Sequence, residues 1–370
     1  MQLVQRILAR WRPRPVPRRG LALAGGGVIG GMYEVGALAA LEESLNGGDA
    51  FFDVYVGCSA GSVVASLMAN GVQPGELYRI LEQDLPDPFN FRRGAVYASD
   101  SARRAFGTFG RLLWALGRNV FDSGGSLPDM LARAEGKLPA GFFKLATLER
   151  FLREALAARG LTNSFSDLKR TLLIPAVDLD RAERVVFGRG ELSDVPISQA
   201  VAASSAIPGF FEPHHIDGRD YVDGGVGFSG HADLAAEAGA EVVLVVNPLV
   251  PNQGANGAGL RSRGLYSIME QANRIYSQNL LKLGLDVMAA RHPRTAFFLL
   301  QPPHTATEMF GPSMGFEASR AALRYGYAST REWLQGEGAP LVRLLTPPDV
   351  PALPARDPAP NGAVRPVTPG

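Results

Sequence analysis

Two glycine-rich segments near the start of the chain carry residues suited to nucleophilic chemistry. The segment GCSAG at 57–61 follows a run of β-branched and aromatic residues at 52–56 and precedes a small, apolar helical stretch. A G-x-S-x-G sequence between a strand and a helix is typical of a nucleophile elbow, which presents its serine hydroxyl above the strand end. Such a tight turn needs residues with almost no side chain on both sides, so Gly57 and Gly61 support Ser59 as a nucleophile.

The second segment, GGGVIGG at 25–31, follows a predicted strand at 20–24 and begins a predicted helix. A glycine-rich turn at a helix start exposes backbone N–H groups to an anion. One chemistry that uses such groups is an oxyanion hole, which would be formed here by the amides of Gly25, Gly26 and Gly27, with Gly30 as a supporting residue.

Dinucleotide binding is the alternative, because the glycines at 25, 27 and 30 also fit the G-x-G-x-x-G fingerprint. That fold requires a second strand that ends in an acidic residue about twenty positions later. Glu42 and Glu43 fall inside the predicted helix, and Asp53 opens the next strand. Since that strand leads to Ser59, the two glycine segments should lie side by side at one sheet edge. This arrangement favours acyl transfer.

A serine nucleophile needs a group that accepts its proton. Asp223 ends a predicted strand at 221–223, and Gly224 and Gly225 leave it open to approach. Burial in a dehydrated cleft would raise the pKa of this carboxyl toward the range that proton abstraction needs. Asp223 is therefore the predicted direct partner of Ser59.

A histidine-containing triad stays open as an alternative. The order Ser…Asp…His, found in α/β-hydrolases, admits His231, His292 or His304 as the base. None has a telling local context, and we expect each to be a surface or capping residue. A second G-x-S-x-G surrounds Ser313, but no strand precedes it, so a loop is predicted there. Cys58 is interpreted as a small core residue.

The remaining pattern predicts an α/β protein. Predicted strands at 171–178, 184–188, 241–246 and 295–300 alternate with helices at 147–159, 197–211 (broken at Pro208), 267–290 and 316–335. This alternation predicts a three-layer α/β/α architecture with a mostly parallel central sheet.

The two terminal segments of the chain differ in composition from its central part. A basic, proline-containing arm is predicted at 1–19, one catalytic domain at 20–345, and a proline-rich disordered tail at 346–370. The arm is either a solvated segment or a short basic turn on anionic lipid. Within 84–148, an amphipathic stretch at 101–121 predicts either a lid or membrane-contact helix or an ordinary surface helix.

Composition narrows the function classes. A net charge of +1 argues against a protein built to hold nucleic acid, and the single cysteine fits a reducing, cytoplasmic compartment. No apolar run approaches the length of a membrane span, so any membrane contact is expected to be peripheral. The sequence says nothing about oligomeric state.

Taken as an ordered set, these motifs resemble the patatin-like phospholipases. That family has a glycine-rich oxyanion loop, a G-x-S-x-G elbow and a D-G-[GA] motif, which match 25–30, 57–61 and 223–225 here. The small-residue stretch at 202–208 is also similar to the family's, and the likeness covers about 20–251. One departure is Ile29, which stands where the family commonly has a basic residue and leaves the head-group preference open.

The resemblance implies a patatin-like variant of the α/β-hydrolase architecture and a Ser59–Asp223 dyad that hydrolyses lipid acyl esters. It implies no metal and no cofactor. Two alternative functions remain open. One is an esterase for small esters that uses a histidine triad, and the other is a non-catalytic protein that binds lipid or membrane.

Overall fold

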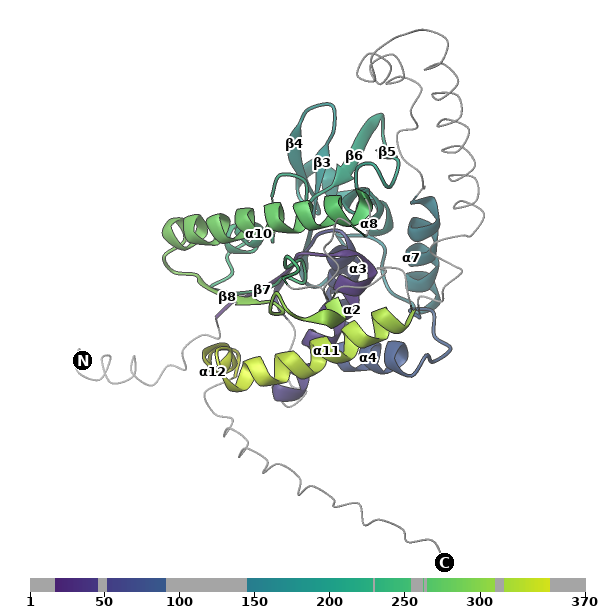
Figure 1. Cartoon of the computed structure of the whole chain (residues 1–370). Coiled ribbons are helices and arrows are strands. Elements are labelled where there is room, and N and C mark those ends of the chain that lie inside the picture. The colour runs from purple at the N-terminus through teal and green to yellow at the C-terminus, as the bar shows by residue number, and fades with distance from the viewer. Residues whose placement is uncertain are drawn as a thin grey trace, which may run out of the picture.

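The computed structural model describes residues 17–45, 52–90, 145–228, 230–253, 262, 265–309 and 316–346 (Figure 1). An eight-stranded sheet forms its centre, in the order β5-β6-β3-β2-β1-β7-β8, with β4 also paired to β3. The strands are β1 (Arg19–Leu23), β2 (Val54–Gly57), β3 (Thr171–Asp178), β4 (Glu183–Phe187), β5 (His214–Ile216), β6 (Arg219–Asp223), β7 (Val242–Val246) and β8 (Ala296–Leu300).

The central strands are parallel and one flank is antiparallel. β1 pairs in parallel with β2 and β7, β2 with β3, and β7 with β8. β3 is longer than its neighbours, and its second half pairs antiparallel with both β4 and β6. The antiparallel strand β6 therefore ends beside the middle of β3, close to where β2 ends.

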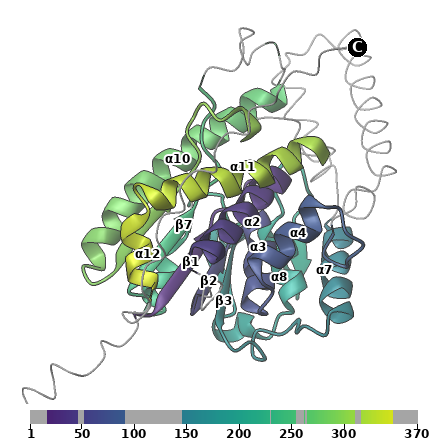
Figure 2. The same ribbon diagram turned by 90° about the horizontal axis from the view of Figure 1, so that it is seen from below.

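Helices cover both faces of the sheet (Figures 1 and 2). They are α2 (Gly27–Ser44), α3 (Ala60–Ala69), α4 (Pro74–Glu82), α7 (Ala146–Ala158), α8 (Ile197–Ser204), α9 (Ala232–Glu237), α10 (Leu265–Arg291), α11 (Phe316–Gln335) and α12 (Ala339–Leu345). In Figure 1, α10 lies above β7 and β8, and α11 lies below them.

Side chains alternate between two apolar clusters along each strand, as the pleat of a strand requires. In β1, Leu21 and Leu23 join the cluster that includes α2, α3, α7, α8 and α11, whereas Ala22 joins the cluster with α9 and α10. Val243 and Val245 of β7 join the second cluster in the same way. The predicted three-layer α/β/α fold with a mostly parallel sheet is confirmed.

Helix α2 is packed closely against α11. A Cβ atom on Gly36 would overlap the carbonyl of Leu323, and one on Gly326 would overlap the carbonyl of Tyr33. Glycines at the crossing point let the two backbones approach each other, which holds α2 and the loop before it against the sheet.

Most predicted elements are present, with some differences. The helix predicted to run to Pro208 ends at Ser204, since the chain turns there toward the strand that carries Asp223. Helices α4, α9 and α12 and the short strand β5 were not predicted. The basic arm up to residue 16, the stretch at 101–121, the loop around Ser313 and the tail from 347 lie outside the described residues.

Candidate active site

The two glycine segments lie next to each other because their strands are neighbours. β1 and β2 pair in parallel with Leu23 opposite Gly57, so both strands end at the same edge. The Cys58 amide continues this ladder by donating to the Leu23 carbonyl at 3.0 Å. As predicted, the glycine loop and the elbow therefore meet at the carboxyl edge of the sheet.

Ser59 has the strained backbone of a nucleophile elbow. Its φ of 53° and ψ of −129° are rare for a residue with a side chain, and α3 begins directly after it. A Cβ on Gly57 would overlap the Gly61 carbonyl, and one on Gly61 would lie 2.7 Å from the Leu23 carbonyl. These two glycines are therefore needed for the turn that presents Ser59.

Three consecutive residues of the glycine loop have positive φ: 84° at Gly25, 117° at Gly26 and 65° at Gly27. A Cβ on Gly25 would lie 2.9 Å from the Ser59 Cβ, so this loop contacts the elbow directly. Within the described part of the chain, the amides of Gly26 and Gly27 bind no acceptor, and both lie at the N-terminus of α2. A helix N-terminus favours negative charge.

Gly25 differs from its two neighbours, and this corrects the sequence-based expectation. Its N–H already donates to Glu34 Oε1 at 3.0 Å, so it is not free for an oxyanion. The carboxyl of Glu34 is fully buried in α2, and burial raises its pKa well above the ordinary value. No sequence motif identified Glu34; its only signal was an acidic residue within an otherwise apolar, buried stretch of α2.

Ser59 and Asp223, predicted to act together, lie near each other. The Ser59 hydroxyl is one of the groups that lower the pKa of the Asp223 carboxyl, and the two residues are 8% and 7% exposed. Asp223 Oδ1 also accepts the Gly225 amide at 2.8 Å and faces the Cys58 thiol at 3.6 Å. Burial raises the pKa of Asp223, although these three donors oppose the rise. The arrangement is suited to proton transfer between Ser59 and Asp223.

Gly224 lets Asp223 reach the elbow. A Cβ at this position would overlap the Pro175 carbonyl and lie 3.2 Å from Cys58 Sγ. Cys58 is buried as expected, and burial, with the nearby Asp223, raises the pKa of its thiol well above the ordinary value. The thiol therefore stays protonated and acts as a weak donor to Asp223, a contact that the sequence did not indicate.

The backbone of Ser59 is held by α8. Its N–H donates to Ser204 Oγ at 3.1 Å, and the Ser204 hydroxyl donates to the Pro175 carbonyl at 2.7 Å. The small-residue stretch at 202–208 thus brings its last helical serine against the elbow. The Ser59 amide is therefore already bonded, whereas the amides of Gly26 and Gly27 in the adjacent glycine loop bind no acceptor among the described residues.

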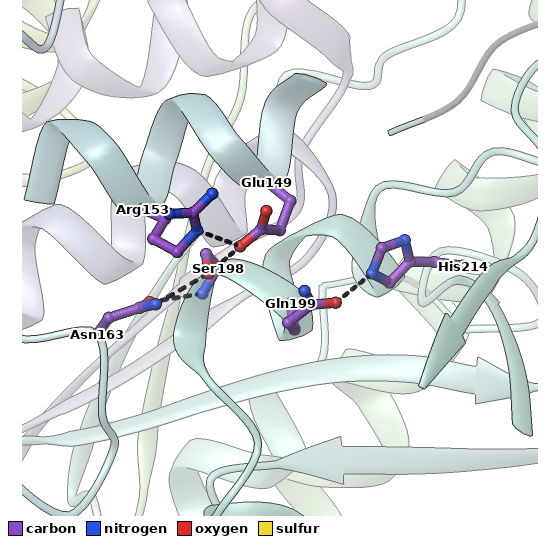
Figure 3. A network of polar contacts seen from close by, with 6 residues as sticks. All are labelled: Glu149, Arg153, Asn163, Ser198, Gln199 and His214. Carbon is purple, nitrogen blue, oxygen red and sulfur yellow. Dashed lines mark hydrogen bonds and ion pairs between the residues drawn. The ribbon is translucent and has the colours of Figure 1, made fainter. Parts of the chain in front are cut away.

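A polar network fixes the other end of α8 (Figure 3). Ser198 Oγ donates to Glu149 Oε1 of α7 at 2.9 Å, and the Ser198 amide donates to Asn163 Oδ1 at 2.8 Å. Further along, Gln199 Oε1 lies 2.7 Å from His214 Nε2 of β5. These contacts orient α8, and with it Ser204, relative to the sheet.

None of the candidate histidines contacts Ser59. His304 Nδ1 lies 3.0 Å from the Pro251 carbonyl, and His292 follows the end of α10. His231 is 1% exposed, so it is not a surface residue; it occupies the N-cap position of α9, but its side chain makes no capping hydrogen bond there. Its Nε2 lies 3.0 Å from the Gly224 carbonyl, and burial lowers its pKa to about 4.

Two further observations concern polar and metal-binding groups. Ile29 is 2% exposed and belongs to the apolar core around α2, so it adds no polar group to the glycine loop. Among the described residues, no three or more His, Cys, Asp or Glu side chains are grouped closely enough to hold a metal ion.

Comparisons with known proteins agree with these motifs. Residues 21–235 match the family model of patatin-like phospholipases. A protein of Invertebrate iridescent virus 6, "Probable lipid hydrolase 463L", is 24% identical over 211 residues, which are 57% of this chain and 61% of the viral protein. The chain thus spans less than two thirds of that relative's length.

Solved structures to which the chain is similar include VipD from Legionella pneumophila, with 17% identity, a TM-score of 0.38, and coverage of 87% of this chain and 67% of VipD. Human GIVD cytosolic phospholipase A2, solved with methyl gamma-linolenyl fluorophosphonate, has 13% identity, a TM-score of 0.39, and coverage of 93% and 63%. Such distant likenesses say nothing about the substrate of this chain.

Proposed function

The chain belongs to the patatin-like phospholipase family, and we propose that it is a lipid acyl hydrolase that cleaves carboxylic esters of phospholipids or related acyl lipids. The observation that carries this proposal is the position of Asp223 beside the elbow: its Oδ1 lies 3.6 Å from the Sγ of Cys58, the residue before Ser59, and the Ser59 hydroxyl lowers the pKa of its carboxyl. The viral relative's name, a probable lipid hydrolase, supports the same substrate class.

In the first half of the proposed reaction, Ser59 Oγ attacks the ester carbonyl carbon while Asp223 accepts the hydroxyl proton. The carbonyl oxygen becomes an oxyanion that the amides of Gly26 and Gly27 stabilise. Loss of one such donor costs about 3–4 kcal/mol in the barrier. The tetrahedral intermediate then collapses, the alcohol leaves with the proton from Asp223, and an acyl ester on Ser59 remains.

In the second half, Asp223 accepts a proton from water, and the resulting hydroxide attacks the acyl carbon. Collapse of the second tetrahedral intermediate releases the fatty acid and returns the proton to Ser59. The same carboxylate thus acts as base, then acid, in each half. Its raised pKa brings its basicity closer to what proton abstraction needs.

The histidine triad is disfavoured by the position of His231, whose Nε2 faces a backbone carbonyl. The test is to measure hydrolysis of long-chain phosphatidylcholine vesicles and of a soluble 4-nitrophenyl ester by the wild type, Ser59→Ala, Asp223→Asn and His292→Ala. We expect both substrates to be cleaved, both dyad variants to be inactive, and His292→Ala to be unchanged. Turnover of only the soluble ester would support the small-ester esterase, and vesicle binding without turnover would support the non-catalytic protein.

We also propose peripheral contact with a lipid surface in a reducing compartment. No helix in the described residues is both long and apolar enough to cross a membrane. Helix α10 exposes large apolar side chains to solvent, including Met269 at 60%, Tyr276 at 63% and Leu283 at 64%. Solvated apolar residues that recur along one helix are a feature of membrane-contact surfaces.

A further inference from the structure

We propose that His231 is a positioning residue, which holds the Gly224–Gly225 peptide in the orientation that aims the Gly225 amide at the Asp223 carboxylate. This inference rests on the proposed function, in which Asp223 is the base. It gives a role to a buried histidine that the dyad mechanism does not use.

The contacts of the ring define its protonation. His231 Nε2 lies 3.0 Å from the Gly224 carbonyl oxygen, which can only accept, so Nε2 carries the hydrogen. Nδ1 lies 3.4 Å from Arg184 Nη1, which can only donate, so Nδ1 carries a lone pair. The ring is therefore a neutral imidazole in one tautomer, and the partners of its two nitrogens are Gly224 and Arg184 rather than Ser59.

The surroundings keep the ring neutral and fixed. Burial lowers the pKa of His231, the Arg184 guanidinium lowers it further, and Asp233 and the Gly224 carbonyl oppose the change. Arg184 of β4 is itself held by Asp233 of α9 at 2.7 Å. The Phe228 ring lies 5.3 Å from the His231 ring. The His231 ring thus stays neutral and donates a hydrogen bond, rather than accepting a proton as a base.

The backbone of His231 is also constrained. Its φ of 41° is left-handed, a conformation that is uncommon for residues with a side chain. The residue lies at the start of α9, and its side chain makes no capping hydrogen bond there. The ring instead contacts Gly224, seven residues earlier in the chain. The strained backbone of His231 therefore supports this contact and not a helix cap.

One planar unit connects this contact to Asp223. The carbonyl of Gly224 and the N–H of Gly225 belong to the same peptide group, which is rigid. His231 binds its carbonyl end at 3.0 Å, and Asp223 Oδ1 binds its N–H end at 2.8 Å. Rotation of this peptide would break both hydrogen bonds together. The histidine therefore acts on the carboxylate through a single peptide plane.

Loss of the His231 contact would raise the pKa of Asp223. The Gly225 amide lowers the pKa of this carboxyl, as do Ser59 and Cys58, the other groups that face it. If the peptide is no longer held, this stabilisation of the carboxylate weakens and the pKa of Asp223 rises further. The base would then be protonated at a higher pH, and it would be less well aimed at Ser59.

The experiment compares His231→Asn with His231→Gln in the full chain, using kcat and KM for a soluble 4-nitrophenyl fatty-acid ester across pH. Asparagine tolerates positive φ but is too short to reach Gly224, so it removes the contact without adding backbone strain. We expect its kcat to fall about 10- to 100-fold with little change in KM, since misplacement of a reacting group by about 1 Å costs about that much.

The pH profile separates positioning from a general loss of structure. In His231→Asn, the acid limb of kcat should move to higher pH. In His231→Gln, whose longer amide can donate to the Gly224 carbonyl, the kcat and the acid limb should return toward wild type. A wild-type profile for His231→Asn, a loss of kcat without a shift of the limb, or a folded His231→Gln as impaired as His231→Asn would overturn the proposal.

A measurement that does not depend on turnover tests the His231 contact separately from the proposed hydrolase activity. In wild-type protein with ¹⁵N-labelled histidine, the His231 ring should show a protonated Nε2 and an unprotonated Nδ1 at pH 7. Ring protonation at neutral pH, or the opposite tautomer, would contradict the contact itself. If the wild type shows this tautomer but cleaves no ester, the hydrolase proposal fails and the assignment of the ring stands.

Discussion

The peptide N–H of Gly25 donates to Glu34 Oε1 at 3.0 Å, which connects the first residue of the glycine loop to the buried side of α2. The second carboxyl oxygen of Glu34 has no hydrogen-bond partner among the described residues. The contact removes Gly25 from the set of free donors and leaves Gly26 and Gly27. It also fixes the loop against Ser59, because Gly25 packs on the elbow.

Glu34 should therefore matter for catalysis without touching substrate. Glu34→Gln keeps an oxygen that can accept from Gly25, and we expect its kcat to stay within about threefold of wild type. Glu34→Leu leaves the buried amide without an acceptor, which costs about 1–3 kcal/mol and releases the loop. Its kcat should fall at least about tenfold, measured with a soluble ester. Equal activities of the two variants would contradict this role.

The buried Glu34 carboxyl should make the stability of the protein depend on pH. Because its pKa is raised in the folded state, the folded protein holds the proton more tightly than the unfolded chain above pH 4.5, its ordinary pKa. The free energy of unfolding contributed by Glu34 should thus fall as pH rises from 4.5 toward the folded-state pKa. Glu34→Gln does not titrate, so urea unfolding should show its stability rising relative to wild type across that window. A constant difference between the two proteins would contradict the burial of an ionisable Glu34.

Two neighbouring glycines provide a matched pair of substitutions. Gly25→Ala and Gly27→Ala both place a side chain at positive φ, with a strain of about 1–2 kcal/mol. Only at Gly25 would the new Cβ meet the elbow, 2.6 Å from the Cys58 carbonyl, whereas nothing lies within 4 Å at Gly27. Thermal unfolding should show the larger destabilisation for Gly25→Ala. The reverse order would show that the loop does not pack on the elbow as described.

Asp223 predicts how activity depends on pH. The proposed base works only when ionised, and burial raises its pKa from 3.8. We therefore expect kcat/KM for a soluble ester to increase with pH through an acid limb that lies above the ordinary aspartate range. Asp223→Asn should abolish turnover and remove the cost of burying a charge, so its melting temperature at pH 7 should equal or exceed that of wild type. An active Asp223→Asn would exclude the dyad.

The exposed apolar side chains of α10 predict that this helix contacts the lipid surface. Leu283→Glu should weaken flotation with phosphatidylcholine vesicles and lower their hydrolysis, while turnover of a soluble short-chain ester stays unchanged. Leu179→Glu is the control, because Leu179 is also solvated, at 48%, but lies after β3 rather than on α10. Equal flotation of both variants and wild type would show that α10 does not contact lipid.

The sequence predicted the parts of the site that local geometry dictates. A strand, a glycine-flanked turn and a helix can be recognised from consecutive residues, so Ser59 and the glycine loop were identified, and the structure places Asp223 beside the elbow that carries Ser59. Their catalytic roles remain predictions. Glu34 and His231 were not recognised as contacts of the site, because their partners depend on side-chain directions in the folded chain. The spacing of His231 from Gly224 does not reveal that its ring turns back onto that carbonyl.

In the proposed mechanism, Ser59 is a nucleophile that Asp223 activates. The most direct test of this mechanism is labelling of the intact protein with a fluorophosphonate, which reacts with an activated serine, followed by mass-spectrometric mapping of the modified residue. We expect a label on Ser59 that is lost in Ser59→Ala and in a folded Asp223→Asn, and retained in His292→Ala. A label on Ser313, or no label on a folded wild-type protein, would contradict it.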